Sequence, residues 1–222
     1  MRSILLLISI ALLSSCSKDY FIADQFKQKT ANHRTIAILP FQVTTTGNLP
    51  QDITEEQLQE IRDAESRAFQ ISLYNEILAS TQSGSKPLKI DVQSPELTVS
   101  LLSEGIMNFN DINSRDPQLL ASMLGVDALV SSSVEKTRYM SDLASFGISL
   151  GRKLLGLFGD DAAELLNDGK TEDIKLVTKI VDPTNGTVLW NFDHKGEADY
   201  SRPSSEIIDF INRKAAKRFP YR

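Results

Sequence analysis

The first sixteen residues constrain this chain most, because they decide in which compartment the rest of it folds. Arg2 provides one positive charge, and an almost entirely apolar ten-residue run, Ile4–Leu13, follows it. Two small residues, Ser14 and Ser15, close the run. A charged start, a short apolar core and small residues before a cleavage site are typical of a secretory signal peptide. The run is too short to span a bilayer, which takes roughly 20 apolar residues. We therefore predict a signal peptide over residues 1–15.

The stretch Leu13–Cys16 resembles the lipobox of bacterial lipoproteins at all four positions. The resemblance implies cleavage between Ser15 and Cys16, diacylation of the Cys16 thiol by palmitate-type chains, and acylation of the new amino group. The alternative is an ordinary signal peptide with a cysteine near its cleavage site by chance. A lone cysteine in an exported chain otherwise has no partner, which favours the lipobox. Acyl chains contribute about 0.8 kcal/mol per buried CH₂, so several chains on one residue form a firm anchor.

Length and composition limit what kind of domain the residues after the signal peptide can form. Removal of residues 1–15 leaves 207 residues, the size of one domain, and 41% of the full sequence is hydrophobic, enough for a core. The formal charge of −5 becomes −6 without Arg2, and a mildly acidic body argues against a nucleic-acid partner. Because Cys16 is the only cysteine, no intramolecular disulfide can form, and the fold depends on packing.

Residues 16–33 are predicted as the lipidated N-terminus and a largely polar tether. Within it Tyr20–Ile22 form an apolar cluster, which rests either on the folded body or on the membrane surface. Ser17 follows the lipidated cysteine, and by the sorting rule known from enteric bacteria it implies the outer membrane, facing the periplasm. The stretch Cys16–Asp19 also slightly resembles the surface-export signal of Bacteroidetes lipoproteins, so display on the cell surface is the alternative. A short charge cluster is usually just solvated.

Hydrophobic periodicity predicts strands and helices that alternate along the body, residues 34–222. Thr54 and Gln57 match a capping box before a long helix, and Asp182–Gly186 is a strong turn signal between two hairpin strands. Thr44–Pro50 is predicted as a loop. Helices that alternate with strands favour an α/β (α+β) class, a mixed β-sheet flanked by helices. The expected strands are 35–41, 88–92, 126–134, 174–181 and 187–192, and the expected helices are 52–80, a short helix opened by Ser94–Glu96, 116–124 and 204–219.

Three of these segments, in this order, resemble a superfamily of bacterial envelope domains that includes CsgG, LpoB, the GNA-type lipoproteins and the TolB N-terminal domain. Thr35–Phe41 looks like its "AVLPF"-type opening strand, and Gly125–Val130 looks like its "GADYLV"-type strand. Ile174–Trp190 looks like its "LRLVDAKTGEVLW" hairpin. The resemblance covers most of residues 34–220. It implies a non-catalytic α/β domain that binds other envelope proteins or itself.

One segment, the insertion 141–171 before the C-terminal hairpin, departs from that pattern. Its apolar residues step mostly by three or four, which predicts a helical insertion, although its glycines each lower helix stability by up to about 1 kcal/mol. The stripe either packs on its own domain or contacts a membrane surface or a partner. Because the segment does not alternate strictly, the pore hairpins of the curli lipoprotein are not expected. The candidate membrane or partner contacts are Phe146, Leu150, Leu154, Leu157 and Phe158.

The sequence offers little that would support catalysis. His33 and His194 are the only histidines, and neither has metal-ligand spacing. Nucleophile motifs of the G-x-S-x-G type and phosphate-binding glycine loops are absent, so we predict no catalytic residue, metal or cofactor. The leading hypothesis is a non-catalytic outer-membrane lipoprotein that acts as a binding or assembly factor for an envelope secretion or cell-wall machine. A subunit of a homo-oligomeric secretion ring is the alternative, and an envelope enzyme ranks third.

Overall fold

The computed structural model describes residues 19–49, 53–82, 87–105, 109, 111–138, 170–199 and 204–222. The described strands are β1 (Tyr20–Ile22), β2 (Thr35–Ile38), β3 (Gln42–Gly47), β4 (Asp91–Val92), β5 (Ala128–Arg138), β6 (Lys170–Val181) and β7 (Val188–Asp199). The described helices are α2 (Phe26–Lys29), α3 (Glu55–Gln82), α4 (Pro95–Ser103), α5 (Pro117–Leu124) and α8 (Ser204–Lys217), with a 3-10 turn η1 (Ile112–Ser114). The predicted class, a mixed sheet flanked by helices, is confirmed. The predicted helical insertion, 141–171, lies almost entirely outside the described residues.

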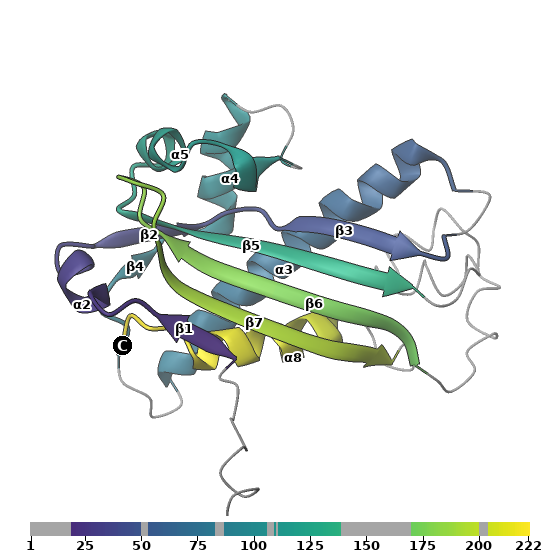
Figure 1. Ribbon diagram of the computed structural model, residues 1–222. Coiled ribbons are helices and arrows are strands. Elements are labelled where there is room, and N and C mark those ends of the chain that lie inside the picture. The colour runs from purple at the N-terminus through teal and green to yellow at the C-terminus, as the bar shows by residue number, and fades with distance from the viewer. Residues whose placement is uncertain are drawn as a thin grey trace, which may run out of the picture.

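Seven strands form one sheet in the order β1-β7-β6-β5-β2-β4, and β3 also pairs with β5 (Figure 1). β2 and β3 run parallel to successive parts of β5. Pro40 lies between them, and proline cannot donate a ladder hydrogen bond, which explains the interruption. β6, β7 and β1 continue the sheet with antiparallel pairing, so that segments from both ends of the chain meet at one edge.

Two hydrophobic cores lie on opposite faces of this sheet. The alternation of β2 divides its residues between them, because successive side chains of a strand point to opposite faces. Ile36 and Ile38 belong to the large core beneath α3 and α8, whereas Ala37 and Leu39 belong to a smaller core formed with α4 and α5. Figure 1 shows α3 and α8 behind the long strands and α4 and α5 above the β2 end. The rest of the second face is not covered by any described helix.

Local sequence signals fix where several elements begin and end. The capping box is confirmed: the Thr54 N–H donates to Gln57 Oε1 (2.9 Å) and the Gln57 N–H donates to Thr54 Oγ1 (3.2 Å). Ser94 caps α4 ahead of a proline at the first helical position. Gly125 ends α5, and Gly186 closes the β6–β7 turn; both have positive φ, at 65° and 69°. These are conformations that an L side chain adopts only with strain.

Two predictions from the sequence are wrong in the described residues. The loop predicted over Thr44–Pro50 begins as a strand, since β3 extends to Gly47 and pairs with β5 throughout. Its threonines are β-branched and suit a strand, which the polarity of the segment concealed. Part of the predicted tether, 16–33, belongs to the folded body instead: Tyr20–Ile22, expected to rest on the body or on the membrane, form the edge strand β1, and Phe26 is buried in the main core.

Candidate functional site

The residues singled out from the sequence lie outside the described part of the chain. They are Ser15, Cys16, Phe146, Leu150, Leu154, Leu157 and Phe158. The structure does describe the elements next to them in the sequence. These are strand β1, which follows the lipobox, and strands β5 and β6, which flank the insertion. These neighbouring elements make up the candidate site.

The first described residue is already held by the sheet. The Asp193 N–H donates to the Asp19 carbonyl (2.9 Å), and the Ala23 N–H donates to the Leu189 carbonyl (2.9 Å). Between these two bonds β1 runs antiparallel to β7, with Tyr20 opposite Phe192 and Ile22 opposite Trp190. The chain is thus part of the folded body from Asp19 onward, three residues after Cys16.

Side chains on β1 form a mixed apolar and basic edge. Tyr20 packs against the main core, and the Arg218 guanidinium lies 5.3 Å from its ring centroid. Arg218 Nε also lies 3.7 Å from Asp19 Oδ1, which joins the end of α8 to the start of β1. Phe21 and Ile22, by contrast, are 54% and 41% exposed. We name Asp19–Ile22 with Arg218 the β1 edge.

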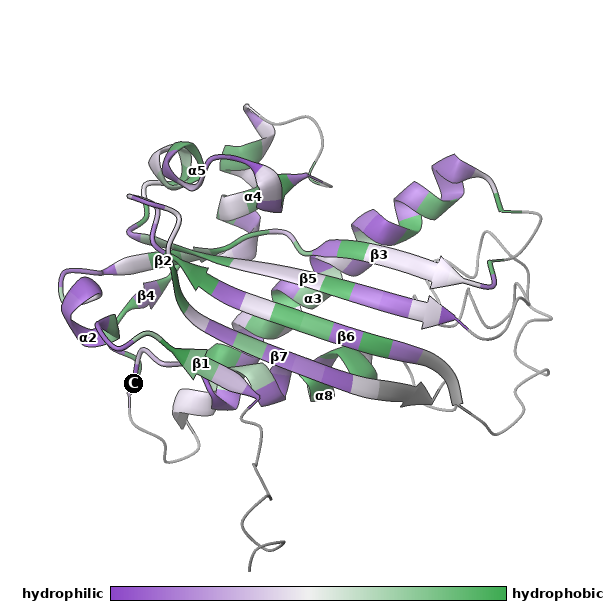
Figure 2. Ribbon diagram, in the orientation of Figure 1, coloured by the Kyte–Doolittle hydropathy of each residue, from purple (hydrophilic) through white to green (hydrophobic). Residues whose placement is uncertain are grey.

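The uncovered face of the long strands is polar. Antiparallel sheets commonly have one face on the core and one in water. Figure 2 shows hydrophilic residues mixed with hydrophobic ones along the described parts of β5, β6 and β7. On the outer face Lys175 Nζ lies 3.9 Å from Glu135 Oε2, an exposed pair of little energetic weight. The residues of this face include Ser133, Glu135, Thr137, Lys175, Val177, Lys179, Asn191, Asp193 and Lys195.

His33 lies within the fold beside a buried tyrosine. Its Nδ1 is 2.7 Å from the Tyr221 hydroxyl oxygen, a contact that joins the C-terminus to the entry of β2. Burial lowers the pKa of His33 and raises the pKa of Tyr221. Close by, burial alone would raise the pKa of Asp127, but the N–H groups of Thr35 and Arg34 donate to its carboxylate and lower the pKa overall. The cluster ties together the C-terminus, the entry of β2 and the start of β5.

The second histidine, His194, also has a structural role, between β7 and α8. Lys214 Nζ lies 3.2 Å from His194 Nε2, which is the geometry of a donor ammonium and a neutral ring. Burial, followed by the charge of Lys214, lowers the pKa of His194. Lys214 also lies 4.5 Å above the centroid of the Phe210 ring. Both histidines therefore have partners that explain them structurally.

A buried ion pair lies between α3 and the sheet. Lys136 of β5 and Glu65 of α3 are 4% and 3% exposed, and Lys136 Nζ donates to Glu65 Oε1. Arg138, two residues further along the same face of β5, is also buried. Buried charges of this kind are costly unless paired, so the pair fixes which face of α3 meets β5. Lys136 and Arg138 are on the last stretch of β5 before the insertion begins.

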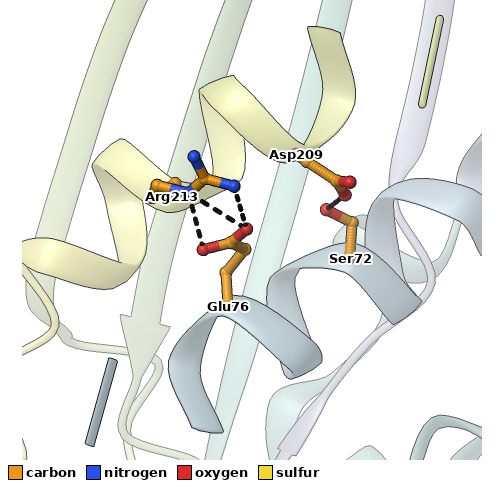
Figure 3. A network of polar contacts seen from close by, with 4 residues as sticks. All are labelled: Ser72, Glu76, Asp209 and Arg213. Carbon is orange, nitrogen blue, oxygen red and sulfur yellow. Dashed lines mark hydrogen bonds and ion pairs between the residues drawn. The ribbon is translucent and has the colours of Figure 1, made fainter. Parts of the chain in front are cut away.

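Polar contacts also join the two helices that cover the main core (Figure 3). The Ser72 hydroxyl donates to Asp209 Oδ1 (2.6 Å), and Arg213 donates to both carboxylate oxygens of Glu76 at 2.9 to 3.2 Å. The Glu76 carboxylate raises the pKa of Arg213 further. The contacts form two separate pairs, Ser72 with Asp209 and Glu76 with Arg213, and both join α8 to α3.

The described ranges contain neither a metal-binding cluster nor a membrane span. In these ranges no three His, Cys, Asp or Glu side chains gather closely enough to hold a metal ion. Within the same residues, no helix is both long enough and apolar enough to cross a bilayer.

The β1 edge escaped prediction as an element because three residues carry too little periodicity to indicate a strand. The apolar cluster Tyr20–Ile22 was its only signal.

Comparison with known proteins gives structural likenesses alone, since no family model and no curated protein matches the sequence. Lipoprotein GNA1162 from Neisseria meningitidis is 14% identical, with a TM-score of 0.45, over 83% of this chain and 96% of that one. The PelC dodecamer from Paraburkholderia phytofirmans is 12% identical, with a TM-score of 0.39, over 86% and 90%. The LpoB C-terminal domain from Salmonella enterica is 10% identical, with a TM-score of 0.35, over 75% and 84%. The resemblance to CsgG and TolB stays a prediction.

Proposed function

We propose that this chain is an outer-membrane lipoprotein, anchored through Cys16 and facing the periplasm, that acts as a non-catalytic binding or assembly factor for an envelope secretion or cell-wall machine. The observation that carries the proposal is the lipobox, Leu13–Cys16, directly after an apolar run of signal-peptide length. A lipid anchor raises the effective concentration of the protein at the membrane without any new contact, which suits an assembly factor.

The structural roles of the titratable side chains support a binding function over a catalytic one. His33 bonds to Tyr221, His194 bonds to Lys214, and Glu65 pairs with Lys136. A general acid or base must instead lie within hydrogen-bond reach of a substrate. Function has to be argued from a site and not from the fold, and in the described residues these three contacts hold the fold together.

The lipobox is tested by Cys16→Ser, which removes the thiol that would carry the acyl chains. We expect the variant to lose palmitate labelling and to leave the membrane fraction or remain uncleaved. Ser9→Ala, which changes the apolar run but none of the four lipobox positions, is the matched control and should label normally. Palmitate labelling and membrane partitioning of the Cys16→Ser protein at the wild-type level would refute the proposal.

The proposed partner contact is the insertion 141–171, through Phe146, Leu150, Leu154, Leu157 and Phe158. Replacing Leu154 and Leu157 by serine should weaken crosslinking to the partner in intact cells and leave the thermal unfolding transition in place. If the stripe is part of the core, the same double variant loses several kcal/mol of stability and unfolds. Circular dichroism melting beside crosslinking and identification of the attached protein separates the two outcomes.

A second candidate function is a subunit of a homo-oligomeric secretion ring. The observation that favours it is the open edge of β3, which in the described ranges pairs with β5 alone. Open strand edges are the usual place where a second chain adds to a sheet. Native mass spectrometry of detergent extracts decides between the candidates: a ring gives multiples of one mass, and a binding factor is found with one different protein.

A further inference from the structure

The place of β1 in the sheet changes how far the body can lie from the membrane. A free tether over residues 16–33 would extend up to about 60 Å and would leave the body free to turn. Because Asp19 already bonds to Asp193, only three residue steps separate Cys16 from the sheet, a reach of about 11 Å at most. This step rests on the proposed lipid anchor at Cys16.

That reach is short compared with the membrane surface itself. The hydrocarbon core is about 30 Å thick and the whole bilayer about 40–45 Å, so each headgroup layer is roughly 5–8 Å deep. Acyl chains on Cys16 place that residue at the inner boundary of the headgroups. Asp19 is then no more than a few ångström beyond the headgroup layer, and the strand that it begins lies at or within it.

The composition of the β1 edge suits that position. Phe21 is 54% exposed and Ile22 is 41% exposed, on opposite faces of the strand. Apolar side chains of this kind enter the boundary between headgroups and acyl chains. Arg218 on the same edge and exposed Lys195 further along β7 offer positive charge to lipid phosphates. Two carboxylates offset part of this charge: Asp19 is paired with Arg218, and Asp193 lies beside Asp19.

We infer that the β1 edge is a membrane-docking surface, with Phe21 and Ile22 inserted at the lipid headgroups of the bilayer that holds the anchor. The body then has a fixed orientation. The opposite side of the molecule, where α4 and α5 lie in Figure 1, points away from the membrane. Leu119 of α5, 55% exposed, marks that far side and has an exposure close to that of Phe21.

The lone cysteine makes a direct test available. Cys16 is acylated in the proposed mature protein, so a single introduced cysteine is the only free thiol and accepts a nitroxide spin label. We choose Phe21→Cys and, as the matched control, Leu119→Cys. Each variant is expressed with its signal peptide, assayed for palmitate labelling, and reconstituted in vesicles of phosphatidylethanolamine and phosphatidylglycerol. Thermal melting checks the fold, and Ile22→Cys provides a second label on the other face of β1.

Electron paramagnetic resonance then compares collisions of each label with apolar oxygen and with a water-soluble nickel chelate. We expect labels at 21 and 22 to favour oxygen and the label at 119 to favour the chelate. Acylated protein with all three labels in water would overturn the docking inference and leave the lipid anchor standing. Labels at 21 and 22 shielded from both reagents would assign the edge to a protein partner instead. Absence of acylation would overturn the anchor and the docking together.

Discussion

At the scale of single residues, the Lys136–Glu65 pair brings two opposite charges into the buried part of the structure. Both side chains lie in the region between α3 and β5, and neither would be stable there without its partner. We expect Lys136→Met to lower the free energy of unfolding by about 3–5 kcal/mol, because it removes a counter-charge from the buried Glu65 carboxylate. Denaturant unfolding followed by circular dichroism measures the change.

The matched control is the double variant Lys136→Met with Glu65→Met, which removes both charges and keeps apolar volume. Its loss of stability should be clearly smaller than that of Lys136→Met alone, since replacing a buried pair by apolar side chains is often nearly neutral. With Glu65→Met measured alone as well, a double-variant loss equal to the sum of the two single losses would mean that the pair is not coupled.

The two histidines make stability depend on pH in a defined direction. Burial holds the pKa of both His33 and His194 below the ordinary value of 6.5. The histidines of the unfolded chain therefore bind protons more readily than those of the folded chain. The stability that they contribute is fully present above pH 6.5 and is lost as the pH falls through the lower folded-state pKa. We expect Tm to fall between about pH 7.5 and pH 5.5, the range in which histidine changes charge.

The pair of substitutions His33→Gln and His194→Gln removes both titrating rings and keeps hydrogen-bonding side chains. In calorimetry this double variant should show a flatter dependence of Tm on pH over the same range. A slope equal to that of the wild type would contradict the assignment. The low pKa of Asp127 adds a further loss only below its ordinary value of 3.8, outside this window.

At the scale of elements, the β6–β7 hairpin depends on one backbone conformation. Gly186 has φ of 69°, and a Cβ placed there would meet no atom within 4 Å, so any cost of substitution comes from backbone strain and not from a clash. We expect Gly186→Val to destabilise the fold by about 1–3 kcal/mol. Gly186→Asn is the control, since asparagine tolerates the left-handed region better, and its melting midpoint should lie between those of Val and Gly.

At the scale of the whole molecule, Trp190 reports on the joining of the chain ends. It is the only tryptophan, it is fully buried, and the Phe219 ring meets it edge-on at 5.7 Å between centroids. We expect Phe219→Ala to cost about 3–5 kcal/mol, as for other buried aromatic residues. Phe210→Ala is the control on α8, where the ring is 53% exposed and a loss of about 1 kcal/mol or less is expected.

The same probe tests whether the molecule unfolds as a unit. The main core contains residues from Phe26 to Tyr221, so Trp190 emission and far-ultraviolet dichroism should change together in denaturant. Separate transitions for the two signals would show that the ends of the chain come apart before the rest of the sheet.

Signals that act over a few residues are predictable from the sequence alone. The capping box at Thr54, the proline-led start of α4 and the glycine turn at Gly186 all occur where the sequence predicts them. Each depends on hydrogen bonds or dihedral preferences within one turn of chain, and nearby residues are enough to specify these. The export signal and lipobox at Leu13–Cys16 are local in the same sense and stay predictions.

Contacts between distant segments escaped prediction because no local pattern encodes them. β1 becomes a strand only because β7 offers it an edge, and Thr44–Gly47 becomes a strand only beside β5. Glu65 meets Lys136 across 71 positions of sequence, and His33 meets Tyr221 across 188. Sheet pairing and burial depend on which segments the chain brings together, so the folded arrangement decides whether a polar loop becomes a strand and whether residues of an expected tether join the sheet.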